Sequence, residues 1–578
     1  MSSRRSVFVL VLLLVAIGAV GLVAVTRLRR PPKAGSDKHV LVYDVPWDIE
    51  ESSPNVSPYS LSALRPDRPS LIEITDAVRR AGEDDHIRAL SLHVGGAEWG
   101  WAKVAELREA LRQFQTRGKP VYVSFSGGSD QAYLLVSGAD RIAMPQTALL
   151  GLDGLTASAM FLKGTYDKVG IRPNFAHVGS FKSAVEQYTR TDLSPDGRRA
   201  LEELLDDEFG LLVDSLASAR RVSRDSMIRL IDRGPFPAGA ALAAGLIDTL
   251  LDEADLDSLA CARAGGRVTP ITMTRYLDQM PELDTGGPAI ALVTASGTIV
   301  PGRDRDGMWD GRQLGSESLV RALQQARLDK SVKAVVLRVD SPGGSGQASD
   351  DIWQEIHRLR KTKPLVVSMS NLAASGGYYI ACGSDGIVAH PGTITGSIGV
   401  FGGKLNILGL YQKLGLNIET VSRGKHAEMM SPFKDFSPEE LQSFQSQMDD
   451  FYRVFLDRVS SGRGMTAAEV DSVAQGRVWS GAAAQRLGLV DTLGGLQTAV
   501  SLARDRAGIP KEEEVRVRLY PDRHRAYFQR FITSFLDDEE TEASLLTRLP
   551  SPVVAWLHAA SFPAGTALAL MPYSIVIR

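Results

Sequence analysis

The amino-acid sequence predicts an α/β fold that is built twice in tandem. Short apolar runs alternate with amphipathic helix patterns, which is typical of βα units whose strands pair in parallel beneath outer helices. The order of these runs then repeats, because DRPSLIEITDAVRRAGEDDHIRALSLHVGG in the first half matches SESLVRALQQARLDKSVKAVVLRVDSPGG in the second. At 578 residues the chain is too long for one ordinary domain and fits two such copies with extensions.

The chain begins with an uncharged apolar run, Val7 to Val25, which has arginines on both sides. As a helix this run nearly crosses a hydrocarbon core of about 30 Å. A cleaved signal peptide is the alternative, but the arginines that follow are poor context for cleavage. We therefore expect residues 1–37 to hold an uncleaved membrane anchor with its span at 7–25. Basic residues after the span outnumber those before it, and a literal positive-inside count would keep the body cytoplasmic.

The repeat predicts a first domain at 38–270 and a second at 285–508, joined through the Gly/Thr-rich stretch DTGGPA. Each copy opens with a strand-like lead, HVLVYDVPW or AIALVTASGTIV, and ends alike, with AGAALAAGLIDTL or SGAAAQRLGLVDTL. Residues 509–578 form a C-terminal extension. Its tail, Ser551 to Arg578, is apolar but broken by prolines, which argue against a second membrane span and favour packing on the body or on the membrane surface.

The composition is that of a globular protein, with 44% hydrophobic and 23% charged residues. The net charge of -3 gives no reason to expect nucleic acid as a partner. The two cysteines, Cys261 and Cys382, lie in separate halves of the chain. A pair between them is possible, but free thiols are the expectation. We expect no cofactor and no metal.

The second copy carries a glycine turn that the first copy lacks. After its first strand it reads DSPGGS, Asp340 to Ser345, where the first copy has only HVGG. Two glycines at such a turn let backbone N–H groups point at an anion or a developing oxyanion, and the following helix adds its positive end. A plain tight turn is the alternative for this stretch alone.

Ser375 lies at the corresponding turn after the next strand, in NLAASGGYYIAC behind the apolar run PLVVSMS. A serine at a helix start is often only an N-cap. Here Gly-Gly follows, which costs helix stability and suits the close approach of another backbone. The first copy reads GGSDQAYLL without the ASGG core, which makes Ser129 a poor substitute. We therefore predict that Ser375 is a nucleophile beside the glycine turn.

A serine nucleophile needs a group that takes its proton. None of the nine histidines lies in a recognisable partner motif, and His390, before a proline near a strand end, fits a structural role better. A lysine can serve if apolar burial keeps its amine neutral. Lowering its pKa from about 10.4 to about 7 costs roughly 4 to 5 kcal/mol, so such a lysine needs a desolvated pocket.

The motifs SPGGS, NLAASGGYYIA, TGSIGVFG and GRVWSGAAAQRLGLVDTLGG, in this order, resemble those of the signal peptide peptidase SppA (protease IV) family. Two copies behind an N-terminal anchor resemble its long form, and the likeness covers roughly residues 38–508. The resemblance implies a ClpP/crotonase-type fold of stacked βα superhelical turns. It also implies a Ser-Lys dyad in which the first copy supplies the lysine. Backbone N–H groups near Gly343 and Gly344 would form the oxyanion hole.

The lysine motif of that family matches VGSFKSAVEQYTRTDLSP, so the resemblance places the base at Lys182. The second copy reads RGKHAEMMSPFKDFSP, with Ala427 where single-copy members carry their catalytic lysine. An ungapped count back from the shared Ser-Pro pairs Lys425 with Lys182 instead. Lys425 therefore stays as the alternative base.

The resemblance implies a membrane-anchored serine endopeptidase that degrades cleaved signal peptides and other short or unfolded peptides. It further implies a bowl-shaped homotetramer on the bacterial inner membrane, with the body in the periplasm. Three alternatives stay open: a catalytically weak membrane assembly factor, a crotonase-like acyl-CoA enzyme and a pure binding protein. The presence of both Ser375 and Lys182 argues against the first, and an acyl-CoA enzyme needs neither a Ser-Lys pair nor an anchor.

Overall fold

The computed structural model describes residues 38–52, 69–265, 267–280, 287–307, 311–521, 567–571 and 576–577. The apolar run from Val7 to Val25 lies outside these ranges. Within them, no helix is both long and apolar enough to cross a membrane.

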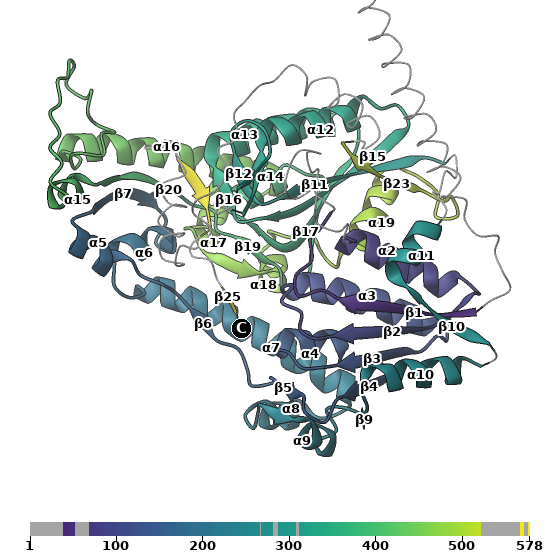
Figure 1. Cartoon of the computed structure of the whole chain (residues 1–578). Coiled ribbons are helices and arrows are strands. Elements are labelled where there is room, and N and C mark those ends of the chain that lie inside the picture. Colours follow the sequence, from purple (N-terminus) through teal and green to yellow (C-terminus); the bar gives the residue numbers. More distant parts are fainter. Residues whose placement is uncertain are drawn as a thin grey trace, which may run out of the picture.

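Two parallel sheets with the same strand order form the two halves of the molecule, which confirms the predicted α/β class (Figure 1). In the first half the order is β10 (Val268–Thr272), β1 (Lys38–Val45), β2 (Ile87–Val94), β3 (Val121–Phe125), β4 (Arg141–Met144) and β9 (Thr249–Leu250). In the second half the equivalent strands are β23 (Arg516–Tyr520), β11 (Ala289–Ser296), β15 (Val332–Ser341), β17 (Leu365–Ala374), β18 (Gly386–Ala389) and β22 (Thr492–Leu493). Two further strands, β19 (Ile394–Gly396) and β21 (Val478–Ser480), extend the second sheet from β17.

Helices cover both faces of each sheet, as expected for a mostly parallel sheet. One face packs against a single helix, α10 (Glu253–Ala264) in the first half and α19 (Leu496–Arg506) in the second. The other face carries α2 (Leu71–Glu83), α3 (Trp101–Thr116) and α4 (Asp130–Val136), and in the second half α12 (Ser316–Leu328), α13 (Gly346–Arg360) and α14 (Gly376–Ala381). A long helix follows in each half, α7 (Pro195–Arg220) and α16 (Pro438–Arg463), and then α8 (Arg224–Ile231) with α9 (Ala238–Ala243), or α17 (Ala467–Val473) with α18 (Gly481–Arg486).

The two long helices show how one local sequence is reused. Each begins at a Ser-Pro pair, in which Ser194 or Ser437 accepts a hydrogen bond from a first-turn backbone N–H and proline follows as the first helical residue. A serine N-cap satisfies a free helix donor, and proline is tolerated at N1 because its missing N–H has no helical partner there. The shared start signal fixes where both helices begin.

A third sheet joins the halves. Its order is β13 (Arg305–Gly307), β14 (Gly311–Gly315), β12 (Thr298–Val300), β16 (Gly343–Ser345), β24 (Leu568–Leu570), β20 (Val400–Asn406) and β7 (Arg172–Val178). Strand β7 belongs to the first copy, yet it pairs antiparallel with β20 of the second along its whole length, from Val178 opposite Val400 to Arg172 opposite Asn406. Between β6 (Ala157–Ser158) and β7 lies α5 (Lys163–Val169), and α15 (Leu408–Lys413) follows β20. This crossover carries first-copy residues into the second half.

A buried ion network also joins the halves. Arg338 on β15 is fully buried and donates to Glu51 at 2.9 Å and to Glu106 on α3 at 2.6 Å. Lys103 on α3 lies 3.0 Å from Asp340, the residue before the glycine turn. Removing one partner from such a network leaves an uncompensated buried charge, which costs about 3–5 kcal/mol. The network therefore fixes how the first copy sits against the second.

The tail and the cysteines can also be compared with expectation. Residues 568–570 of the tail pack on the body as β24, and β25 (Val576–Ile577) pairs with β6. Cys261 and Cys382 are free thiols, as expected.

Candidate active site

Ser375 ends β17 in a strained turn and begins α14. Its backbone has φ +56°, which few non-glycine residues adopt, and its N–H donates to the Gly396 carbonyl at 2.8 Å. The side chain is fully buried and makes no capping hydrogen bond to α14, so Ser375 is not an ordinary N-cap. In the first copy, Ser129 precedes α4 with an extended backbone at φ -79°. Only the second copy has the sharp serine turn.

Lys182 reaches Ser375 because β7 crosses into the second half. The strand ends at Val178, and a short turn through Gly179 brings Lys182 to the second copy. Gly476 closes over it: this residue has φ +76°, and a Cβ there would lie 2.6 Å from the Lys182 backbone nitrogen and from its Cβ. A glycine is therefore required at 476 for the lysine to sit this deep.

The two predicted residues meet directly, although they are 193 positions apart in the sequence. The Lys182 Nζ atom lies 2.8 Å from Ser375 Oγ. The same Nζ atom donates to the backbone carbonyl of Ser397 at 3.1 Å and to its hydroxyl at 3.0 Å. The Lys182 side chain is only 1% exposed. The serine, the lysine and Ser397 thus form one buried cluster.

Burial lowers the pKa of Lys182 well below its ordinary value. Desolvation is the cause, since removing the amine from water disfavours the ammonium form. The three nearby oxygen atoms are uncharged, so they hold the amine in place without the full stabilisation that a carboxylate would give. A neutral lysine amine next to a serine hydroxyl can accept its proton.

The glycine turn lies beside the serine turn. A Cβ on Gly343 would lie 2.6 Å from the Gly376 nitrogen and 3.0 Å from the Ala374 carbonyl oxygen, so the two turns are in backbone contact on either side of Ser375. Gly343 N–H donates to Ser341 Oγ at 3.2 Å. Gly344 follows in β16, opposite Ile299 of β12 and Ala569 of β24. The structure thus brings the predicted oxyanion segment to the predicted nucleophile.

The other sequence candidates lie elsewhere. Lys425 is exposed and pairs with Glu439 at 2.6 Å, and Ala427 is exposed in the same segment. His390 is half-buried, and its Nδ1 accepts from the Gly392 N–H at 3.3 Å. Burial lowers the pKa of His390 to about 4, which fits a neutral structural ring. Lys425 and His390 make no contact with Ser375.

Sequence reasoning missed the part played by Ser397. It lies in the TGSIG stretch with φ +50°, and its N–H donates to the Arg477 carbonyl at 2.7 Å. The run Thr-Gly-Ser-Ile-Gly looks like a simple turn, and the lysine that donates hydrogen bonds to its serine comes from the other copy. The strained backbone is visible only in the fold.

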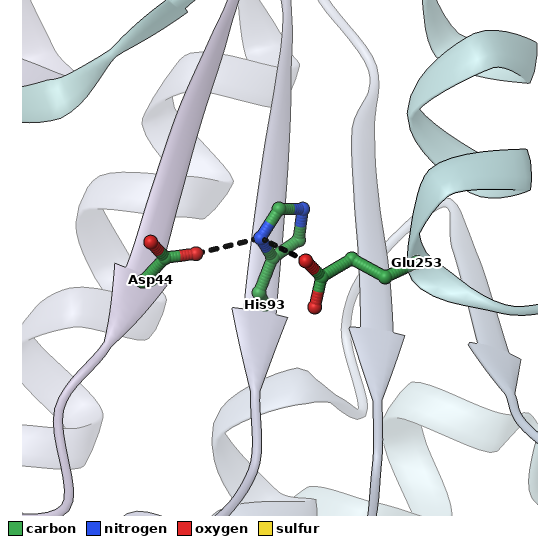
Figure 2. A group of neighbouring side chains, drawn as sticks. All are labelled: Asp44, His93 and Glu253. Atoms are coloured by element: carbon green, nitrogen blue, oxygen red, sulfur yellow. Dashed lines mark hydrogen bonds and ion pairs between the residues drawn. The ribbon is translucent and has the colours of Figure 1, made fainter.

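A second polar cluster lies at the ends of β1 and β2 in the first copy (Figure 2). His93 Nδ1 is 2.6 Å from Asp44 and 3.3 Å from Glu253, and its Nε2 is 3.1 Å from Asp257. Burial alone would lower the pKa of His93, but hydrogen bonds to Asp257 and Asp44 outweigh it and raise the pKa to about 9. The ligand atoms of Asp44, His93 and Glu253 are close enough to hold a metal ion. Without a metal, a protonated His93 ring donates from both nitrogens to carboxylates, which makes the group a charge cluster.

Comparison with known proteins identifies the family of this chain. The model of peptidase family S49 matches residues 113–264 and 357–510. Serine protease SPPA, chloroplastic, of Arabidopsis thaliana is 34% identical over 77% of this chain and 67% of its own length. Protease 4 of Salmonella typhi is 33% identical over 78% of this chain and 74% of its own length, and Protease 4 of Haemophilus influenzae is 32% identical over 76% and 73%.

Among solved structures, the 1510-N membrane-bound stomatin-specific protease S97A mutant covers 40% of this chain and 97% of its own at 15% identity, with a TM-score of 0.26. That score is too low to add to the argument. The family model matches each copy once, and relatives at 32–34% identity cover most of the chain. The protein is a serine peptidase that belongs to peptidase family S49.

Proposed function

We propose that the protein is an endopeptidase with a Ser-Lys dyad, in which Ser375 is the nucleophile and Lys182 the general base. The observation that carries this proposal is the 2.8 Å contact between Lys182 Nζ and Ser375 Oγ in a fully buried setting. The parallel sheets and the paired glycine and serine turns support a ClpP/crotonase-type fold for the two copies. Family membership favours peptide hydrolysis over the acyl-CoA and binding alternatives.

The proposed reaction is acyl transfer to water. Neutral Lys182 takes the Ser375 hydroxyl proton while Oγ attacks the peptide carbonyl carbon, and backbone N–H groups near Gly343 and Gly344 stabilise the oxyanion. The resulting ammonium gives its proton to the leaving amine as the C–N bond breaks, which leaves an ester on Ser375. Lys182 then deprotonates a water molecule that hydrolyses this ester.

Ser397 stabilises the protonated form of Lys182 in these steps. Its carbonyl and hydroxyl oxygens both accept from Lys182 Nζ, so they stabilise the ammonium each time it forms. Because burial favours the neutral amine, this stabilisation is needed only while the proton is on the lysine. The arrangement holds the amine in one orientation through both half-reactions.

We further propose that the substrates are cleaved signal peptides and other short or unfolded chains. The complete burial of Ser375 supports this, since a folded protein has no extended backbone to offer such a site. The apolar run at 7–25 supports single-pass anchoring in a membrane. The resemblance to the long form of the SppA family, and not the charge count around the run, supports the bacterial inner membrane as this membrane and the periplasm as the location of the catalytic body. The expected assembly is a homotetramer.

The test of the dyad compares three variants on a fluorogenic peptide. We expect Ser375→Ala and Lys182→Ala each to lower kcat/KM by at least about a thousandfold, because neither nucleophile nor base has a substitute. Lys425→Ala is the matched control and keeps parental activity. Substantial activity in Lys182→Ala, or its loss in Lys425→Ala, would refute Lys182 as the base.

A second measurement separates a peptidase from an acyl-CoA enzyme. A serine-directed acylating probe should label Ser375 in the parent protein, as read by mass spectrometry of the modified peptide. Labelling should fall in Lys182→Ala, since the hydroxyl is then no longer activated. An unlabelled parent protein would contradict the nucleophile.

A further inference from the structure

One cluster of side chains in the first copy takes no part in the proposed Ser-Lys chemistry. It lies at the carboxyl ends of β1 and β2, where Asp44 and His93 stand opposite each other in the strand register. Helix α10 adds Glu253 from its first turn and Asp257 from its second. Leu256, between these two, is fully buried in the core between α10 and the sheet. The helix therefore holds its two carboxylates in a defined place.

The His93 ring presents its two nitrogens to different partners. Nε2 lies 3.1 Å from Asp257, which also accepts from Ser91 Oγ at 2.6 Å. With its proton on Nε2, the ring directs the Nδ1 lone pair at Asp44, 2.6 Å away, and at Glu253, 3.3 Å away. Figure 2 shows both carboxylates turned toward this one nitrogen. Three such acceptors repel one another unless a cation lies between them, and either a proton or a metal ion can fill that place.

The distances suit a metal ion. An ion bonded at about 2.1 Å to nitrogen and oxygen ligands holds those ligands roughly 3 to 3.5 Å apart. The ligand atoms of Asp44, His93 and Glu253 all lie within 4.8 Å of one another. The Asp44 side chain is 85% exposed and that of Glu253 is 59% exposed, so small rotations at the surface bring both oxygens to bonding distance. The hydrogen bond from Nε2 to Asp257 is the outer contact that typically orients a histidine ligand and fixes its tautomer.

The second copy shows that the fold does not need these polar residues. The equivalent positions on β11, β15 and α19 hold Thr294, Arg338, Leu496 and Val500. Of these, Arg338 is buried and pairs with two glutamates of the first copy. A hydroxyl, a guanidinium and two aliphatic side chains make no metal site. The histidine with its three carboxylates is therefore a feature of the first copy alone.

The charge of the cluster also favours a metal ion. Within the described ranges, the ion pairs of Asp44, Glu253 and Asp257 go to His93, and none goes to a lysine or arginine. Three carboxylates exceed the charge of one protonated ring, so the cluster attracts further positive charge.

One imidazole nitrogen and two carboxylate oxygens, with an exposed side left for water, are a ligand set that suits Zn²⁺. We infer that Asp44, His93 and Glu253 bind one Zn²⁺ ion, with Asp257 as the positioning residue behind the histidine. The zinc site shares no residue with the proposed Ser-Lys dyad and is independent of it.

The test measures zinc binding by the tag-free full chain after treatment with a chelator and dialysis. Calorimetric titration with ZnCl₂ should show a site in the parent protein that is at least about a hundredfold weaker in His93→Gln and in Asp44→Asn, because each variant loses a direct ligand. The Asp44 side chain is exposed at a strand end, so Asp44→Asn leaves the core intact and gives a result even if His93→Gln does not fold. The matched control is His86→Gln, which removes another histidine that pairs with a carboxylate, Asp84 at 3.0 Å, and it should bind zinc like the parent protein.

Two further measurements separate metal ligands from residues that serve only the fold. Asp257→Asn keeps an acceptor for Nε2 but loses the charge, so zinc affinity should fall about tenfold. Saturating zinc should raise Tm in the parent protein and in His86→Gln but not in Asp44→Asn. A chelator keeps His93 in its protonated form, which is the reference state for these comparisons.

The parent protein would overturn the zinc site if it showed no calorimetric binding, or if Asp44→Asn bound zinc with equal affinity. Equal weakening in His86→Gln would also overturn it, because binding would then depend on surface histidines in general. None of these results bears on the Ser-Lys dyad.

Discussion

Ser397 illustrates how the site depends on single residues with strained backbones. Ser375 at φ +56° and Ser397 at φ +50° face the same Lys182 amine from two different turns. Strain of this kind costs of order 1–3 kcal/mol per residue and persists only where the surroundings enforce it. Here the buried halves of the molecule enforce both turns, which keeps the hydroxyl and the amine aligned before substrate arrives.

We predict that Ser397→Ala lowers kcat/KM by about ten- to a hundredfold. The change removes one of the acceptors of the transient ammonium, and a hydrogen bond to a charged group contributes about 1.5–3 kcal/mol. It also lowers the pKa of Lys182 further, so the acidic limb of the kcat/KM profile moves to lower pH. Ser397→Gly removes the same hydroxyl but tolerates the positive φ, so it is the control for backbone strain and should show the same shift. A profile with an unmoved acidic limb would show that Ser397 serves only the fold.

At the scale of strands and helices, much of the architecture could be predicted from the sequence. The repeat predicted two equivalent α/β halves, and PLVVSMS and DSPGGS correctly marked the strand and the turn that flank Ser375. The crossing of β7 into the second half could not be predicted, because a strand that pairs with its own copy and one that pairs with the sister copy have the same side-chain pattern. For the same reason, no pattern in the sequence predicts that Leu568–Leu570 form a strand beside Gly343.

The cluster around His93, at the end of β2, makes the stability of the first half depend on pH. The pKa of His93 is raised from 6.5 to about 9, so its contribution to stability is fully present below about pH 6.5 and is lost as the pH rises through 9. We expect the free energy of unfolding to fall by about 1 kcal/mol over this window, since Asp44 and Glu253 are largely exposed and screened. Denaturant titrations of the parent protein and of His93→Gln at several pH values measure it. An equal pH dependence in both would contradict the assignment.

At the scale of the whole molecule, the two copies differ in what their corresponding strands bind. Strand β7 follows α5 and pairs with β20. Residues 416–423 follow α15 in the same way, yet they form no strand in the described structure and stay exposed, with Leu416 and Ile418 on the surface. On the other side, the first-copy counterpart of β20 is β6, and in the described part of the chain its residues Ala157 and Ser158 pair with the end of the tail. The segment that pairs as β7 in the first copy is thus exposed in the second, which offers neighbouring chains a head-to-tail contact.

We therefore predict that residues 416–423 hold the proposed oligomer together by pairing with residues near 157–158 of a neighbouring chain. Leu416→Asp/Ile418→Asp places two charges in that contact, so light scattering after size exclusion should show a shift from the assembly to the monomer. Leu328→Asp, at another exposed leucine, on α12, is the control and should leave the mass unchanged. Lys182 and Ser375 come from one chain, so labelling of Ser375 should persist in the monomer. An unchanged mass in the double variant would place the subunit contact elsewhere, and lost labelling would mean that the dyad needs its neighbour to hold its geometry.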